Sequence, residues 1–143
     1  MTEISDLNRA RRHLSTTDLR LVLVKDDRIV ARGERAGVID LWEIYQEKPH
    51  YLKKAAAADS VVGRAAAFIM AAGDAAACYG QIMSRGAEEI LRWAGIIYEA
   101  DVSVEAIKKA EGDGLCPLEE LTAEAEAPQE ALDLLADFLE GSD

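Results

Sequence analysis

The sequence predicts an α/β protein, a three-layer α/β/α sandwich on a mixed five-stranded sheet. Segments with strand-like β-branching alternate along the chain with segments of helical periodicity, which favours parallel strands joined by right-handed crossover helices. A hairpin pattern at residues 18–32 adds antiparallel pairing on one side of the sheet. The chain of 143 residues is half hydrophobic, which suits one folded domain and excludes overall disorder.

The first half of the chain is predicted to form a helix, a hairpin, a second helix and a third strand. Apolar residues three and four apart predict the helices, and alternating β-branched residues predict the strands. The second helix is expected to end at Lys48-Pro49, because a residue before proline avoids the helical conformation. The expected ranges are 4–16 for the first helix, 18–25 and 29–32 for the hairpin, 38–48 for the second helix and 55–58 for the third strand.

The second half continues the alternation. Asp59 and Ser60 offer N-cap side chains to a helix over residues 60–72, which is apolar all round except for Arg64 and is closed by Gly73. The expected ranges that follow are a strand at 76–83, a helix at 84–95, a strand at 96–99, a helix at 103–110, a shaped loop at 112–118 and a final helix from Pro128 with Leu132, Leu135, Phe138 and Leu139 facing inward. We divide the single domain, 1–143, into an N-terminal helix (1–17), a core (18–121) and an acidic helical tail (122–143).

The net charge of −11 lies entirely in the C-terminal part of the chain. Residues 1–109 contain 16 basic and 16 acidic residues, whereas residues 110–143 contain 11 acidic residues and no basic one. A nucleic-acid-binding surface needs clustered positive charge, so we expect no nucleic-acid partner. The acidic tail is interpreted either as a solvated face or as an arm that docks on a basic partner.

The sequence favours a cytoplasmic protein without a membrane partner. Its N-terminus lacks the basic and apolar pattern of a secretory signal, and no apolar run reaches the length of a membrane span. Its two cysteines, Cys78 and Cys116, suit a cytosolic protein better than a disulfide scaffold. With His13 and His50 they form no zinc-finger pattern, so no metal and no cofactor are expected.

Four segments carry a family resemblance. They are Leu21-Val-Leu-Val-Lys-Asp-Asp-Arg-Ile-Val30, Ala57-Ala-Asp-Ser-Val-Val-Gly-Arg-Ala-Ala-Ala67, Tyr79 to Ser84, and Gly114-Leu-Cys-Pro-Leu-Glu-Glu-Leu121. Together with the order of elements, they resemble the domain of unknown function 1893 family, a bacterial branch of the cytidine deaminase-like fold. The Asp-Ser-Val-Val-Gly-Arg and Gly-Leu-Cys-Pro runs are the specific parts.

The zinc ligands of active deaminases are absent from the matching places. Those enzymes bring a His-x-Glu to the helix after the hairpin and a Pro-Cys-x-x-Cys to the helix after the third strand. Here the first place reads Arg35-Ala-Gly-Val38 and the second reads Ala58-Asp-Ser-Val-Val-Gly63, without a ligand or an acid–base residue in the first and without a thiol in the second. The sequence therefore argues against zinc-dependent deamination, because a fold alone does not supply the chemistry.

The resemblance implies that two helix N-termini meet in a cleft at one edge of the sheet, where their N–H groups attract anions. The candidate ligand-binding residues are Gly37, Asp59, Ser60, Gly63, Arg64 and Ser84. Each has a structural alternative. Asp59 and Ser60 would cap a helix, Gly63 would allow close packing, Arg64 would be a solvated position, and Ser84 would start the following helix.

Three residues are weaker candidates for catalysis. Cys116, at the N-cap of a helical turn that starts at Pro117, is interpreted as a nucleophile or as a packed, inert thiol. Asp113 is interpreted as a turn residue or as part of a loop that covers the cleft. Asp59 is the third.

Two functions from different classes follow. The first is a non-catalytic binding or regulatory module for a nucleotide-like or small anionic ligand, and the second is a metal-independent enzyme that uses Asp59, Asp113 or Cys116. A homo-oligomer is expected under either function.

Overall fold

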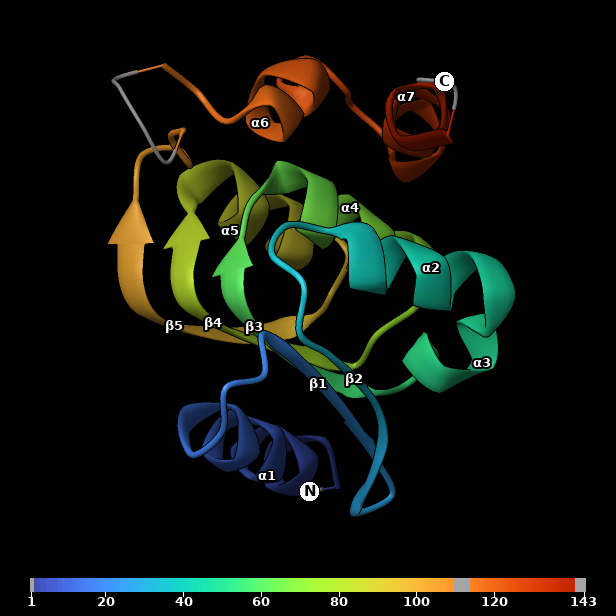
Figure 1. The fold of residues 1–143 in the computed structure, drawn as a ribbon, viewed down its shortest axis with the longest axis vertical. Coiled ribbons are helices and arrows are strands. Elements are labelled where there is room, and N and C mark those ends of the chain that lie inside the picture. Colours follow the sequence, from blue (N-terminus) through green and yellow to red (C-terminus); the bar gives the residue numbers. More distant parts are fainter. Residues whose placement is uncertain (1, 110–113, 141–143) are drawn as a thin grey trace.

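The computed structural model describes residues 2–109 and 114–140, which form one mixed five-stranded sheet with helices on both faces (Figure 1). The strands lie in the order β2-β1-β3-β4-β5. β1 pairs antiparallel with β2 and β3, whereas β3, β4 and β5 are parallel. The bounds are α1 Thr2–Ser15, β1 Leu21–Lys25, β2 Arg28–Gly33, α2 Ile39–Glu47, α3 Pro49–Leu52, β3 Ala56–Val62, α4 Arg64–Ala72, β4 Ala77–Ser84, α5 Arg85–Trp93, β5 Ile97–Val104, α6 Pro117–Thr122 and α7 Pro128–Glu140. The α/β class and the mixed five-stranded sheet are therefore confirmed.

Each face of the sheet has its own core. α1 covers one face, where Leu7, Ala10 and Leu14 pack against side chains of β1, β3 and β4. α2, α4 and α5 cover the other face, and α6 and α7 lie outside α4 (Figure 1). The prediction that the helix before Gly73 is buried on more than one side is confirmed, because every residue from Ala65 to Met70 is buried.

β3 is longer than the sequence predicts. Val61 and Val62 extend the strand and pair with Ile82 and Met83 of β4, so that α4 begins only at Arg64. The prediction that Asp59 and Ser60 cap this helix is therefore wrong. Two β-branched valines beside a parallel neighbour favour the strand over the local capping signal.

β5 is also longer than expected. Val102 and Val104 pair with Ile82 and Ser84 of β4, and the strand runs to Val104. The helix predicted at 103–110 is wrong as far as residue 109, and residue 110 lies outside the described residues. Alternating β-branched residues beside a parallel neighbour again override a weak local preference.

Two smaller predictions also fail. The sequence placed no helix after Lys48, yet Pro49 begins the short helix α3, with proline in the first turn, where its missing N–H costs nothing. Phe138 was expected to face inward, but 45% of its surface is exposed. α7 rests on the outside of the molecule, so its buried stripe is narrow and centres on Leu132 and Leu135.

No helix within 2–109 and 114–140 is long and apolar enough to cross a membrane.

Candidate functional site

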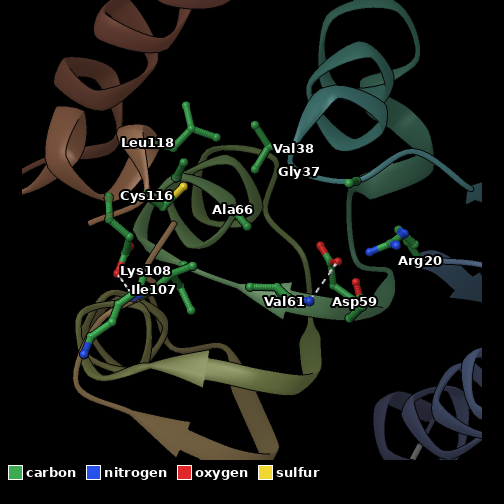
Figure 2. Close-up of a pocket in the computed structure, with 15 residues that line it drawn as sticks. Arg20, Gly37, Val38, Asp59, Val61, Ala66, Ile107, Lys108, Cys116 and Leu118 are labelled. Atoms are coloured by element: carbon green, nitrogen blue, oxygen red, sulfur yellow. Dashed lines mark hydrogen bonds between the residues drawn. The ribbon is translucent and has the colours of Figure 1, made fainter. Parts of the chain in front are cut away.

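A cavity of about 290 Å³ lies where β3 ends and the N-termini of α2 and α4 meet. The segment after β5 and the start of α6 close its other side (Figure 2). The residues that line it are Arg20, Ala36, Gly37, Val38, Asp59, Ser60, Val61, Gly63, Ala65, Ala66, Ile107, Lys108, Cys116, Leu118 and Glu119. Most of these side chains are small and apolar, which is the usual character of a small-molecule site.

Asp59 is the most unusual group at this cavity. It lies in β3 between its partners Leu21 of β1 and Gly80 of β4, and only 5% of its surface is exposed. Its Oδ1 accepts one long hydrogen bond, from the N–H of Val61 at 3.4 Å. Among the described residues, no hydrogen bond reaches the other oxygen of Asp59. In the same part of the chain, every side-chain N or O atom that is inaccessible to solvent has a hydrogen-bond partner, so this oxygen must be accessible. Asp59 lines the cavity, and the cavity is where its free oxygen is exposed.

Burial perturbs the protonation of Asp59. Loss of solvation raises the pKa of its carboxyl to about 7, against the opposing effect of the backbone N–H groups of Val61 and Ser60. A carboxyl that changes charge near neutral pH inside a cavity is a typical feature of functional sites.

Arg20 is held beside Asp59 by the backbone. The N–H of Arg20 donates to the Gly33 carbonyl at 2.8 Å, and its carbonyl accepts from the N–H of Ser60 at 3.0 Å. Figure 2 shows the Arg20 side chain directed toward the Asp59 carboxyl. Its charge lowers the pKa of Asp59, although this effect is smaller than that of burial. Arg20 itself is exposed, so it borders the cavity from the solvent side.

The N-terminus of α4 already holds a carboxylate, that of Glu119 on α6. Glu119 is buried, and its Oε1 accepts from the N–H of Arg64 at 2.6 Å while its Oε2 accepts from the N–H of Ile107 at 2.9 Å. A Cβ at Gly63 would lie 2.8 Å from the same Oε1. Gly63 therefore gives Glu119 room to approach the helix, which is the close-packing alternative that the sequence offered.

The N-terminus of α2 is open by comparison. Gly37 adopts a positive φ of 81°, which a residue with a side chain rarely adopts, and a Cβ there would meet no atom within 4 Å. Val38, the N-cap residue, has no side chain that could cap the helix. Gly37 and Val38 thus border the cavity, and Figure 2 shows Gly37 on the side away from Ile107 and Lys108.

Arg64 and Ser84, two of the predicted ligand-binding residues, are not among the lining residues. The guanidinium of Arg64 donates to the carbonyls of Thr122 and Ala125, at 2.9 and 3.0 Å, so it binds the end of α6 and the segment after it instead of being solvated. Ser84 is fully buried, and its Oγ accepts from the N–H of Ala87 as the N-cap of α5. The other four predicted residues, Gly37, Asp59, Ser60 and Gly63, do line the cavity.

The catalytic candidates are only partly brought together. Cys116 lines the cavity and stands at the N-cap of α6, as predicted, on the side away from Asp59 in Figure 2. Asp113 lies outside the described residues. His13 lies in α1 and His50 in α3, and neither lines the cavity. Within the ranges 2–109 and 114–140, no three His, Cys, Asp or Glu side chains converge as metal ligands would.

Sequence reasoning missed two lining groups that shape the site. Glu119 enters the sequence analysis only as part of the run from Gly114 to Leu121, and Arg20 is not singled out there. Glu119 contacts the start of α4 although it lies 55 residues further along the chain, and a local sequence pattern cannot predict such a long-range contact. For Arg20, the only available signal was its place near the start of the strand predicted at 18–25, at the edge where the cleft was expected.

Comparison with known proteins places the chain in a family. The model of the domain of unknown function 1893 (DUF1893), named TM1506, matches residues 9–139. The crystal structure of a DUF1893 family protein from Thermotoga maritima has a TM-score of 0.86 and 19% sequence identity, over 96% of this chain and 92% of that chain. At this identity the likeness shows the fold alone. No curated protein matches the chain. Because the family model spans most of the sequence, the chain belongs to the DUF1893 family.

Proposed function

We propose that the protein is a binding module that holds a small molecule in the Asp59 cavity. The observation that carries this proposal is a carboxyl that is almost fully buried, yet has one oxygen without a partner in the described part of the chain. Because this oxygen is accessible from the cavity, a ligand with a hydrogen-bond donor can pair with it in surroundings that are mostly apolar.

The charges of the cavity favour a nucleotide-like ligand over a small anion. Glu119 already accepts the N–H groups that an anion at the N-terminus of α4 would need. Asp59, when ionised, adds a second negative charge to the same cavity. The ring of a nucleobase or nucleoside suits the small apolar walls, while any phosphate would lie outside, on the side of the exposed Arg20.

The deaminase-like interpretation of the fold stays part of this proposal. It is supported by a hairpin beside three parallel strands and by two helix N-termini that border one cavity. The places where a deaminase carries its zinc ligands hold Gly37 and Asp59 here, which supports binding without metal-dependent chemistry.

A metal-independent enzyme is the second candidate function, favoured by one observation. A carboxyl with a pKa of about 7 is suited to take up or release a proton at neutral pH. Under this function Cys116→Ser or Asp113→Asn abolishes an activity while the melting temperature stays nearly unchanged. Under the binding function, Asp59→Ala alters ligand-induced stabilisation, and no turnover of the bound molecule is detected.

A thermal-shift screen against nucleobases, nucleosides, nucleotides and dinucleotide cofactors tests the binding function. A ligand at one hundred times its dissociation constant stabilises a protein by about 2.7 kcal/mol, which raises the melting temperature of a chain of this size by roughly 10 °C. The control is Leu118→Trp, which fills the cavity from the half-buried wall of α6 and is checked for folding by circular dichroism. Loss of the shift in this variant supports the proposal. A screen without any hit contradicts it, and so does a hit that Leu118→Trp leaves unchanged.

A further inference from the structure

We propose that the ligand of the cavity is a compact ring compound whose edge presents two neighbouring N–H donors to the Asp59 carboxylate, as an amidine or a guanine-type base does. This inference rests on the proposed binding function and adds the chemical class of the ligand.

The first step is the hydrogen-bonding capacity of Asp59. An ionised carboxylate is an acceptor only, with about four lone-pair sites on two oxygens. Among the described residues its side chain receives one long bond from Val61, which leaves most of these sites free. A ligand with two parallel N–H groups can donate one hydrogen bond to each oxygen of a carboxylate. This bidentate pairing is the strongest arrangement that a neutral or cationic ligand can make with a carboxylate.

The second step concerns the charges that face Asp59. Arg20, before β1, stabilises its ionised form, while Asp40 of α2 disfavours it. Burial raises the pKa of the Cys78 thiol on β4, and the nearby charge of Asp59 raises it further. Across the cavity stand Glu119, engaged with two backbone N–H groups, and Lys108, whose side chain is exposed and points away from the cavity in Figure 2. A ligand that carries donors therefore suits the Asp59 side, and an anionic ligand does not.

The third step is the size and the wall of the cavity. Its volume of about 290 Å³ is at the lower end of the usual range for ligand sites, so it accommodates a ring system rather than a whole nucleotide. Val38, Val61 and Leu118 supply apolar contact from three different segments. The ligand class is thus a ring with an apolar face and one edge of paired donors.

Two matched pairs of probes test this class by calorimetric titration. Guanosine presents a ring N–H and an amino group side by side, and inosine lacks the amino group. Benzamidine presents two amine-type nitrogens, and benzamide replaces one of them by an acceptor oxygen. We expect the first member of each pair to bind at least about tenfold more tightly, because a hydrogen bond to a charged group is lost in the second. Affinity should rise roughly tenfold between about pH 6 and pH 8 as Asp59 ionises.

Two variants complete the test. Asp59→Asn should weaken guanosine and benzamidine by about tenfold or more and abolish the pH dependence, since an amide offers a donor where an acceptor is needed. Asp74→Asn is the control, because it removes one exposed carboxylate at the opposite end of α4. Should Asp59→Asn fail to fold, the two probe pairs on the native protein still decide the matter.

The outcomes separate this inference from the binding function. Equal affinity within both pairs, or no loss on Asp59→Asn, overturns the donor-pair class. If these probes do not bind but another compound from the screen binds and is blocked by Leu118→Trp, the cavity is a binding site for a different class and only the present inference fails. If no compound binds at all, both fail.

Discussion

Glu119 and Arg64 hold α6 against α4 by bonds in both directions. The Glu119 carboxylate accepts the backbone N–H of Arg64 at 2.6 Å, while the Arg64 guanidinium donates to the carbonyl of Thr122 at the end of α6 and to that of Ala125 beyond it. A Cβ at Gly86 would lie 2.8 Å from Cγ of Arg64, so this glycine makes room for the arginine. The wall of the cavity that carries Cys116 and Leu118 is thereby fixed to the start of α4.

Glu119→Ala should destabilise the protein by about 1–3 kcal/mol, because it leaves two part-buried N–H groups, of Arg64 and Ile107, without their acceptor. Glu119→Gln keeps one acceptor oxygen, so its free energy of unfolding should lie between that of Glu119→Ala and that of the native protein. Urea denaturation measures both, and Glu120→Ala, an exposed residue on the same helix, is the control. If Glu119→Ala were no more destabilising than Glu120→Ala, the capping role of Glu119 would be excluded.

Arg64→Lys should loosen the connection between α6 and α7. A lysine carries one compact ammonium group and cannot reproduce the two bonds of a guanidinium to two carbonyls. We expect a cost of about 1–2 kcal/mol and faster amide hydrogen exchange in α7. Arg85→Lys is the matched control, since among the described residues Arg85 makes one exposed ion pair, with Glu105. Similar exchange in the two variants would contradict this role of Arg64.

The pKa of Asp59 makes the stability of the protein depend on pH in a definite direction. Between its ordinary pKa of 3.8 and its folded pKa of about 7, the folded state keeps a proton that the unfolded state has lost. Stability from this group is therefore highest at low pH and falls through that window, by up to roughly 4 kcal/mol, and stays at the lower level above it. Asp59→Asn lacks this dependence.

Urea denaturation of the native protein and of Asp59→Asn at several pH values checks this prediction. The difference between them cancels the titration of the other acidic residues. The variant should gain stability relative to the native protein as the pH rises from about 4 to 8. A difference that does not change with pH would mean that Asp59 has an ordinary pKa.

The two cysteines should differ in their reactivity toward a thiol reagent. Cys78 is fully buried in β4, and burial raises its pKa far above the ordinary value, so it should react only after unfolding. Cys116 is half-buried at the cavity and should react in the folded state. Mass spectrometry of the labelled protein identifies the modified residue. If Cys78 were labelled as fast as Cys116, this placement of the two residues would be contradicted. If Cys116 were labelled no faster in the folded protein than in the denatured protein, it would no longer be a candidate nucleophile.

Much of the fold follows from local patterns in the sequence. The hairpin, the buried helix before Gly73, the N-cap at Ser84 and the helix from Pro128 each arise from short-range preferences, and all are confirmed. The two strands that were predicted too short, β3 and β5, failed for a common reason. Their second halves, which end in Val61-Val62 and Val102-Ser-Val104, are stabilised by β4, a neighbour whose position local patterns do not give.

The candidate site was found from the sequence only in part. Gly37, Asp59, Ser60, Gly63 and Cys116 were proposed and line one cavity, because they follow strands or precede helices at the same edge of the sheet. Asp59 was misread as a helix cap, which concealed that it is a buried carboxyl. Its burial depends on β1 and β4 on either side, and these contacts join residues far apart in the chain.

The central claim is that the Asp59 cavity binds the protein's small-molecule ligand, and mapping of ligand-induced amide chemical shifts by nuclear magnetic resonance tests it most directly. With guanosine, or with the strongest hit of the screen, we predict that the largest shifts cluster at residues 36–38, 59–66, 107–108 and 116–119, the segments that border the cavity. Shifts concentrated on α1 or on the outer face of α7, with these segments unchanged, would contradict the claim.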